Sequence, residues 1–272
     1  MRKHLRFLIA VVALSGFVAA GCGRDSDADD NASSTTKQAT TAVPAVTGNI
    51  TVSAAASLTE AFTKIGEDFE TANPDATTTF NFGSSGTLAT QILQGAPADT
   101  FASADEDNMI KLVDASLVDG SPVVFATNKL AIVTKPGNPK DVKTLADLAT
   151  AGIVSLCADT VPCGKYAAQI LQTAGVTIPE TSVTRGQDVK ATLAAVTTGD
   201  AEAAIVYVTD AKSAGSAVDA VTIPDAENAI ATYPIATLTA STNKEASKAF
   251  VDSVTSSKGQ ATLRSFGFLP PS

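Results

Sequence analysis

The chain has 272 residues, of which 44% are hydrophobic and 17% charged, and its formal net charge is −9. This length and composition suit one two-lobed globule or two modest domains, and they argue against a disordered or fibrous protein. The negative charge disfavours nucleic acid and anionic membrane surfaces as partners, because both require a basic surface.

The first residues, 1–22, have the three-part layout of a secretory signal. Three basic residues among the first six precede an apolar run, and small residues then lead to Cys22. The run is too short for a comfortable transmembrane helix. A cysteine after small residues is similar to a bacterial lipobox, although Ala19 stands where that motif usually has Leu. We predict a lipoprotein signal peptide with lipidation at Cys22; the alternative is an ordinary signal peptide.

Residues 23–47 consist mainly of Asp, Ser, Thr, Ala and Asn. Such a segment cannot bury enough surface to offset its chain entropy, so it is expected to be a disordered tether. We therefore expect an exported protein anchored to the outer face of the cell membrane through its lipid only. Without the signal the chain would carry 19 − 3 = 16 basic and 28 acidic residues, a net charge of −12. Any bound anion must then be held by local geometry, since the overall field repels it.

The histidine and cysteine content narrows the chemistry. The sole histidine, His4, lies in the predicted signal, which excludes Ser-His-Asp and Cys-His catalysis and His-based metal sites. With Cys22 assigned to the lipid, Cys157 and Cys163 remain, six positions apart around a loop that contains proline. An exported setting permits a disulfide between them. The alternatives are two free thiols or half of a metal site, for which further soft ligands are missing.

From Gly48 onward, short apolar strands alternate with amphipathic helices, which predicts parallel sheets covered by helices. In residues 58–72 the apolar side chains recur at the helical period. The expected strands are Asn49–Ala55, Thr77–Phe82, Thr100–Ser103, Val123–Phe125, Leu130–Thr134, Ile153–Cys157, Ala203–Val208 and Tyr233–Thr239. The expected helices are Leu58–Ala72, Thr87–Gln94, Glu106–Ala115, Thr144–Ala149, Gly164–Gly175, Val189–Thr198, Lys244–Ser256 and Lys258–Phe266.

The chain is expected to cross between two lobes twice. The crossings are placed near Lys129–Thr134, just before a turn rich in Pro and Gly, and near Tyr233–Ile235. They divide the globular part into lobe 1, residues 48–126 plus 236–272, and lobe 2, residues 127–235. The last two helices are expected to pack back on lobe 1.

Four strand-to-helix junctions carry small and polar residues, and ligands of open α/β sheets bind at the carboxyl ends of strands. Helix starts expose unpaired N–H groups backed by the positive end of the dipole. Several helix starts that face one cleft can bind an anion without a positively charged side chain, and hydroxyl groups add further donors. The alternative is that the polar residues at these junctions only cap the helices, as Ser57 and Glu60 would in a capping box. The junctions are Ala54–Glu60, Phe82–Thr87, Val161–Tyr166 and Arg185–Val189.

Short motifs occur in a fixed order between Asn49 and Leu269, and together they resemble the periplasmic molybdate-binding proteins of ABC transporters. They are Ser53–Thr59, Gly83–Ala89, Gly95–Asp99, Ser103–Asp105, Val161–Tyr166, Asp188–Val189, Ile205–Tyr207 and Phe266–Phe268. The resemblance implies an α/β fold of the periplasmic-binding-protein type, with two lobes, each a mainly parallel sheet flanked by helices, and two crossover segments. It also implies a monomer without cofactor or catalytic activity, which delivers molybdate or tungstate to an ABC permease and its ATPase.

The resemblance further implies the ligand set. Ser57 and Ser85 would offer hydroxyl and amide donors, Cys163 and Val189 backbone N–H groups, and Tyr207 its phenol. Cys163 stands where many members have Ala, a change that an amide contact tolerates. From the residues alone, Tyr207 can equally be a core aromatic.

Three alternatives stay open. One is a binder of another oxyanion, such as sulfate or phosphate, or of a small carboxylate. Arg185 would bind the carboxylate in the latter case; the simpler interpretation is that Arg185 is a surface charge. Another is an exported serine hydrolase with Ser57 or Ser85 as nucleophile and Lys165 as base. The last is a purely structural surface lipoprotein, which would not explain the ordered motifs.

Overall fold

The computed structural model describes residues 46–271. The predicted signal peptide, Cys22 and nearly all of the predicted tether lie outside these residues. No helix between residues 46 and 271 has the length and apolar character required to span a membrane.

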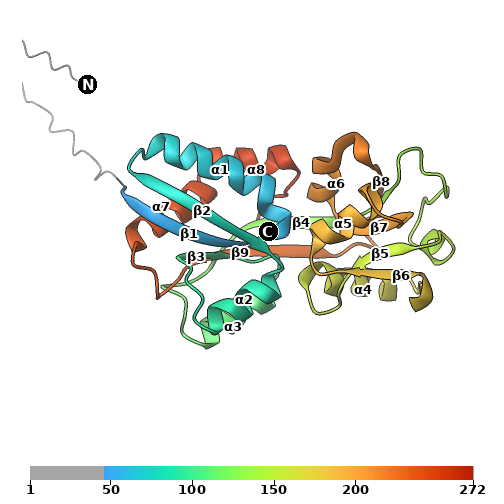
Figure 1. The fold of residues 1–272 in the computed structure, drawn as a ribbon, viewed down its shortest axis with the longest axis horizontal. Coiled ribbons are helices and arrows are strands. Elements are labelled where there is room, and N and C mark those ends of the chain that lie inside the picture. The colour runs from blue at the N-terminus through green and yellow to red at the C-terminus, as the bar shows by residue number, and fades with distance from the viewer. Residues whose placement is uncertain (1–45, 272) are drawn as a thin grey trace, which may run out of the picture. The chain divides into compact units, whose positions relative to one another are not determined.

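Two mixed β-sheets share one long strand, β4 (Val123–Thr134), and are wrapped by helices (Figure 1). In the first sheet, strands β1, β2 and β3 are parallel to one another, whereas β9 runs antiparallel to both β3 and β4. In the second sheet, β5, β6 and β7 are parallel, and β4 runs antiparallel to β7 and β8. The other strands are β1 (Gly48–Ala55), β2 (Ala76–Gly83), β3 (Thr100–Ala102), β5 (Val154–Cys157), β6 (Val183–Gly186), β7 (Ala203–Tyr207), β8 (Asp219–Thr222) and β9 (Ile230–Thr237).

Strands β4 and β9 connect the two sheets. The first half of β4, up to Lys129, pairs with β9, and its second half, from Leu130, pairs with β7 and β8. The sequence predicted two separate strands here, but the chain forms one continuous strand with an irregular register between Val124 and Ala126. The predicted lobe boundaries therefore fall within β4 and β9, and they remain predictions.

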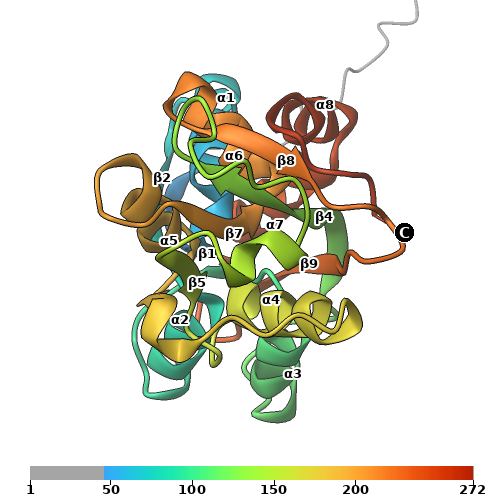
Figure 2. The same ribbon diagram turned by 90° about the vertical axis from the view of Figure 1, so that its right-hand side faces the viewer.

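The helices divide between the two sheets (Figures 1 and 2). Helices α1 and α8 pack together on one side of the first sheet, and α2 and α3 pack together on the opposite side. The return of α7 and α8 to the first sheet is as expected from the sequence. The helices are α1 (Thr59–Ala72), α2 (Ser85–Leu93), α3 (Glu106–Asp114), α4 (Pro162–Thr173), α5 (Val189–Thr197), α6 (Val208–Ala214), α7 (Lys244–Thr255) and α8 (Ser257–Phe266), with short 3₁₀ turns η1 (Ala56–Leu58), η2 (Ala146–Ala149), η3 (Glu180–Ser182) and η4 (Gly215–Ala217).

The aromatic core lies between α1, α7 and the first sheet. Phe62 of α1 packs against Phe125 of β4 and Phe250 of α7, with ring centroids 5.6 and 5.8 Å away. On the other face of this sheet a smaller cluster, which includes Leu88 and Leu112, holds α2 and α3. The strands of the first sheet are thus fixed on both faces, and so are the loops at their carboxyl ends.

Two strands and one α-helix were not predicted, and one predicted helix was assigned the wrong type. Strands β6 and β8 and helix α6 were missed, and the helix expected over Thr144–Ala149 is the 3₁₀ turn η2. The two-lobed α/β class is as predicted, although the antiparallel strands β4 and β9 make both sheets mixed.

Candidate functional site

A small cavity of about 20 Å³ lies where the two sheets face each other. Its walls are the loops that follow β1, β2 and β3 on one side and β5, β6 and β7 on the other. The carboxyl ends of the parallel strands of both sheets therefore meet at this cavity, as expected for a ligand site of open α/β sheets. The five predicted ligand residues, Ser57, Ser85, Cys163, Val189 and Tyr207, all line it.

Four helical segments begin at the cavity: η1, α2, α4 and α5. The first N–H groups of a helix have no partner inside the helix, and the dipole adds partial positive charge there. Pro162 occupies the first turn of α4, where its missing N–H costs nothing. Asp188, which precedes α5, uses its carboxylate to accept the N–H of Ala191 at 2.8 Å. The first turns of these four segments therefore lie at the cavity.

The hydroxyl groups at the cavity are buried, and their partners differ. Ser57 Oγ lies 2.9 Å from Tyr233 Oη, and Ser85 Oγ accepts the N–H of Ala104 at 3.0 Å. Ser84 Oγ and Tyr207 Oη have no hydrogen-bond partner among the described residues. A buried hydroxyl without a partner is uncommon in folded proteins. Both hydroxyl groups are therefore available to a hydrogen-bond partner from outside the described part of the chain.

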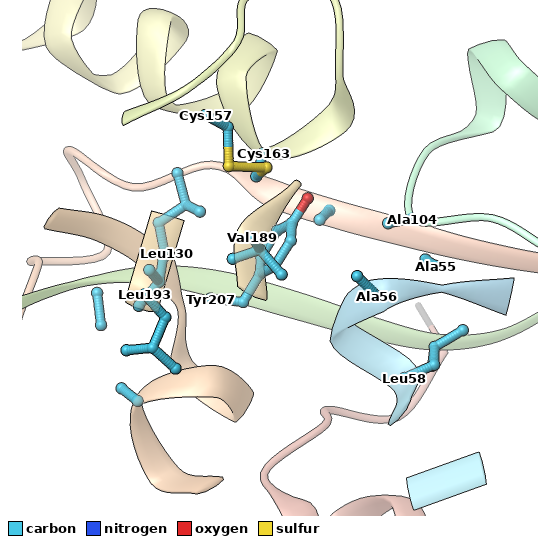
Figure 3. Packing of buried hydrophobic residues seen from close by; sticks show 14 of the residues in the cluster. Ala55, Ala56, Leu58, Ala104, Leu130, Cys157, Cys163, Val189, Leu193 and Tyr207 are labelled. Carbon is cyan, nitrogen blue, oxygen red and sulfur yellow. A yellow bond between two sulfur atoms is a disulfide. The ribbon is translucent and has the colours of Figure 1, made fainter. Parts of the chain in front are cut away.

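Tyr207 is a proton donor at any physiological pH. Its side chain is only 1% exposed, and burial raises the pKa of its phenol well above the ordinary value. Figure 3 shows Cys163 and Val189 on one side of the Tyr207 hydroxyl and Ala56 and Ala104 on the other. The phenol therefore sits between the two halves of the cavity wall.

A disulfide joins Cys157 at the end of β5 to Cys163 in the first turn of α4 (Figure 3). The two Cα atoms are 5.7 Å apart. Thr192 of α5 donates its hydroxyl to the Cys157 sulfur at 3.2 Å. The bridge ties the start of α4, where Cys163 lines the cavity, to the sheet behind it.

The other polar residues singled out in the sequence lie elsewhere. The capping box was wrong, because the Ser57 hydroxyl contacts Tyr233 and Glu60 pairs with Lys190. The Arg185 guanidinium binds Asp159 and Glu180, and Arg185 is absent from the lining of the cavity as far as the described residues show.

Two lysines from the second lobe reach carboxylates of the first, which sequence reasoning missed. Lys190 of α5 donates to Glu60 of α1 at 2.7 Å. Lys165 of α4 donates to Asp107 of α3 at 2.9 Å, so the amine considered as a base is engaged in an ion pair. Each lysine closely follows a cavity residue, Val189 or Cys163.

The Lys190 ammonium also lies 3.1 Å from Asp210, a fully buried carboxylate on α6. Burial raises the pKa of Asp210 to about 6, although Lys190 opposes this shift. Burial lowers the pKa of Lys190, but Asp210 and Glu60 together raise it above the ordinary value. Lys190 therefore stays charged and neutralises acidic groups from both lobes.

Comparisons with known proteins agree with this geometry. Residues 50–269 match the family model described as bacterial extracellular solute-binding protein. The molybdate-binding protein ModA of Mycobacterium tuberculosis (strain H37Rv) is 38% identical over 97% of this chain and 97% of its own. The periplasmic molybdate-binding protein of Azotobacter vinelandii has a similar structure, with a TM-score of 0.75, 20% identity and coverage of 82% of this chain and 100% of that one. The sulfate-binding protein SubI of Mycobacterium tuberculosis has a TM-score of 0.72 and 21% identity, covering 82% and 86%.

Proposed function

The chain belongs to the bacterial extracellular solute-binding proteins, which are binding proteins and not enzymes, and from this premise we propose that it captures molybdate for an ABC importer. Ser57, Ser85 and Tyr207 would bind the ion through hydroxyl groups, and Cys163 and Val189 through backbone N–H groups. We add Ser84 to this set, because its buried hydroxyl also faces the cavity.

The unpaired, fully buried Tyr207 hydroxyl carries the proposal. It lies in a cavity whose lining, within residues 46–271, includes no lysine or arginine. A dianion would therefore be held by neutral donors: hydroxyl groups and the N–H groups of helix starts. Hydrogen bonds to a charged group in a water-excluded site are stronger than those between neutral groups. This compensates for the net negative charge of the chain.

The dimensions and chemistry favour a small inorganic oxyanion over a carboxylate. The cavity of about 20 Å³ has little room beyond a few atoms, and Arg185 is engaged by Asp159 and Glu180. The choice of molybdate is supported by the 38% identical relative. Tungstate has nearly the same size and charge, so we expect it to bind as well. Sulfate is the second candidate, because the fold is shared with a sulfate-binding protein.

The remaining parts of the proposal rest on the sequence. We propose that Cys22 is lipidated, that residues 23–47 tether the folded part to the membrane, and that a monomer delivers the ion to a permease driven by its ATPase. A lipid label incorporated by the full chain in a bacterial host, and lost in Cys22→Ser, would support the anchor. Equal labelling of both chains would overturn it.

Calorimetric titration of the purified protein with molybdate, tungstate, sulfate and phosphate tests the ion assignment. We expect molybdate and tungstate to bind with similar affinity and more tightly than sulfate or phosphate. Sulfate binding as tight as molybdate would overturn the assigned ion, and the absence of binding to all four anions would overturn the function.

A further inference from the structure

Outside the cavity, a chain of buried hydrogen bonds runs from the second lobe to Ser57. Asn128 of β4 donates its Nδ2 to Thr209 Oγ1 at 2.9 Å and to Tyr233 Oη at 3.5 Å. Tyr233 of β9 in turn lies 2.9 Å from Ser57 Oγ. Asn128 and Tyr233 are both completely buried. The chain starts beside α6, crosses the two strands that join the sheets, and ends at a cavity hydroxyl.

The direction of each hydrogen bond follows from Asn128. Its Oδ1 accepts the backbone N–H of Lys129 at 2.9 Å, which an amide NH₂ group cannot do. The Nδ2 group therefore faces the hydroxyl groups, and Tyr233 Oη must accept from it.

The Tyr233 proton then has one acceptor within the described part of the chain, Ser57 Oγ. The opposite direction would leave a phenol proton without a partner in a fully buried place, which is costly. Ser57 Oγ thus accepts from Tyr233, and its own proton is free to point into the cavity.

We infer that Tyr233 and Asn128 are positioning residues that fix the Ser57 hydroxyl as a donor toward the bound anion. The inference rests on the proposed function, and it extends that function to selectivity. An oxyanion without protons accepts from Ser57. Hydrogen phosphate also carries a proton that needs an acceptor, and the Ser57 hydroxyl, which already accepts from Tyr233 and donates into the cavity, does not offer one. At Ser57, this relay from Asn128 through Tyr233 therefore favours molybdate, tungstate and sulfate over hydrogen phosphate.

A double-mutant cycle tests whether Tyr233 acts through Ser57. Affinity for molybdate and for phosphate is measured by calorimetry in the wild type, Tyr233→Phe, Ser57→Ala and the double variant. We expect Tyr233→Phe to weaken molybdate binding by about three- to tenfold and to affect phosphate less, because the freed Ser57 hydroxyl can then also accept. In the Ser57→Ala background, Tyr233→Phe should have no further effect.

Additive effects in the cycle would overturn the relay, because they would mean that Tyr233 acts through packing alone. Tyr233 does pack against Tyr207 and Phe268, so thermal unfolding of each variant is recorded as well. Tyr166→Phe serves as the matched control, since Tyr166 is a partly buried tyrosine outside the cavity lining. It should leave the ratio of the two affinities unchanged.

A second variant covers the case in which Tyr233→Phe does not fold. Asn128→Leu keeps the branching at Cγ and removes the donor that sets the direction, and its effect should likewise vanish in the Ser57→Ala background. If the wild type binds molybdate while both cycles are additive, the relay fails and the proposed function stands. A wild type that binds none of the tested anions overturns both.

Discussion

Lys190 Nζ lies 2.7 Å from Glu60 Oε1, and this ion pair joins α5 of one lobe to α1 of the other. Both residues are close in sequence to cavity residues, Val189 and Ser57. The pair therefore bridges the two walls of the cavity. Lys165 and Asp107 make a comparable contact between α4 and α3. Two ion pairs therefore hold the walls of the cavity together.

Removing the charge at one of these contacts should speed release of the ion. We expect Glu60→Gln to weaken molybdate binding by about two- to fivefold at low salt, chiefly through faster dissociation, because the pair is partly exposed. Stopped-flow measurement of ligand release checks this. Glu67→Gln is the control, because Glu67 lies on the same helix and pairs within it with Lys64. Equal release rates for both variants at low salt would contradict the prediction.

The two contacts use different residues, so their effects should add. Glu60→Gln combined with Lys165→Gln is expected to give the product of the two single fold-changes. Raising the ionic strength should shrink all three effects, since surface pairs are screened. If the loss of molybdate affinity did not depend on salt concentration, it would result from altered packing and not from the lost charge.

Tyr207→Phe tests the ligand set directly. The phenol has no hydrogen-bond partner among residues 46–271, so its loss should cost only the contact with the ion. We expect molybdate affinity to fall by about 1–3 kcal/mol, the usual value of a hydrogen bond to a charged group. The protein itself should be as stable as the wild type or more so, because a buried unpaired hydroxyl is removed. Unchanged affinity by calorimetry would remove Tyr207 from the site.

Asp210 should make stability depend on pH. Its pKa is about 6 in the folded protein against 3.8 for the free side chain, so between these values the folded state holds one more proton. The unfolding free energy therefore falls as pH rises through this window, by on the order of 3 kcal/mol from this group. Asp210→Asn should lack this component.

Urea unfolding of the wild type and of Asp210→Asn between pH 4 and pH 8 measures the contribution of Asp210. The contribution is the difference between their unfolding free energies at each pH. This comparison cancels carboxylates such as Asp107, whose pKa is lowered by Lys165 and which act in the opposite direction. A difference that stays constant across the range would contradict the assignment.

The Cys157–Cys163 bridge should stabilise the fold modestly. It closes a short loop, and the chain-entropy model gives about 2 kcal/mol for a loop of this size. We expect the pair of changes Cys157→Ala and Cys163→Ala to lower the unfolding free energy by that amount. Molybdate binding should persist, because Cys163 would bind through its amide. Loss of binding in a variant that remains folded would show that the bridge orders the α4 start.

The alternating strands and helices were predicted well from the sequence, whereas the strands that connect the two sheets were predicted poorly. Helix α1 has apolar residues at the helical period, and strand β1 is a short, largely buried run, and both are local signals. Strand β4 was divided in two because the polar Thr127 and Asn128 interrupt its apolar run, yet both are buried in the structure. Strands β6 and β8 are short and largely exposed at the edges of a sheet. Their pairing depends on tertiary neighbours that no local pattern reveals.

In the candidate site, too, local features were predicted and long-range contacts were not. The helix starts and their small residues are local features, and the five predicted residues do meet at one cavity. The ion pair of Glu60 with Lys190 and the contact of Ser57 with Tyr233 join residues separated by 130 and 176 positions. The capping-box assignment of Ser57 and Glu60 failed because both side chains bind partners that are distant in sequence. A buried tyrosine beside a proline, Tyr233-Pro234, was the available signal for the second contact.

Strand β9 lies between β3 and β4 in the first sheet, although it comes more than a hundred residues after β3 in the chain. A chain synthesised only as far as β8 has no strand to fill that place, and the facing edges of β3 and β4 stay unpaired. Helices α7 and α8, which cover the same sheet, arrive later still. We therefore expect the first sheet to be completed only once the last forty residues or so are available, and contacts of such long range make for slow folding.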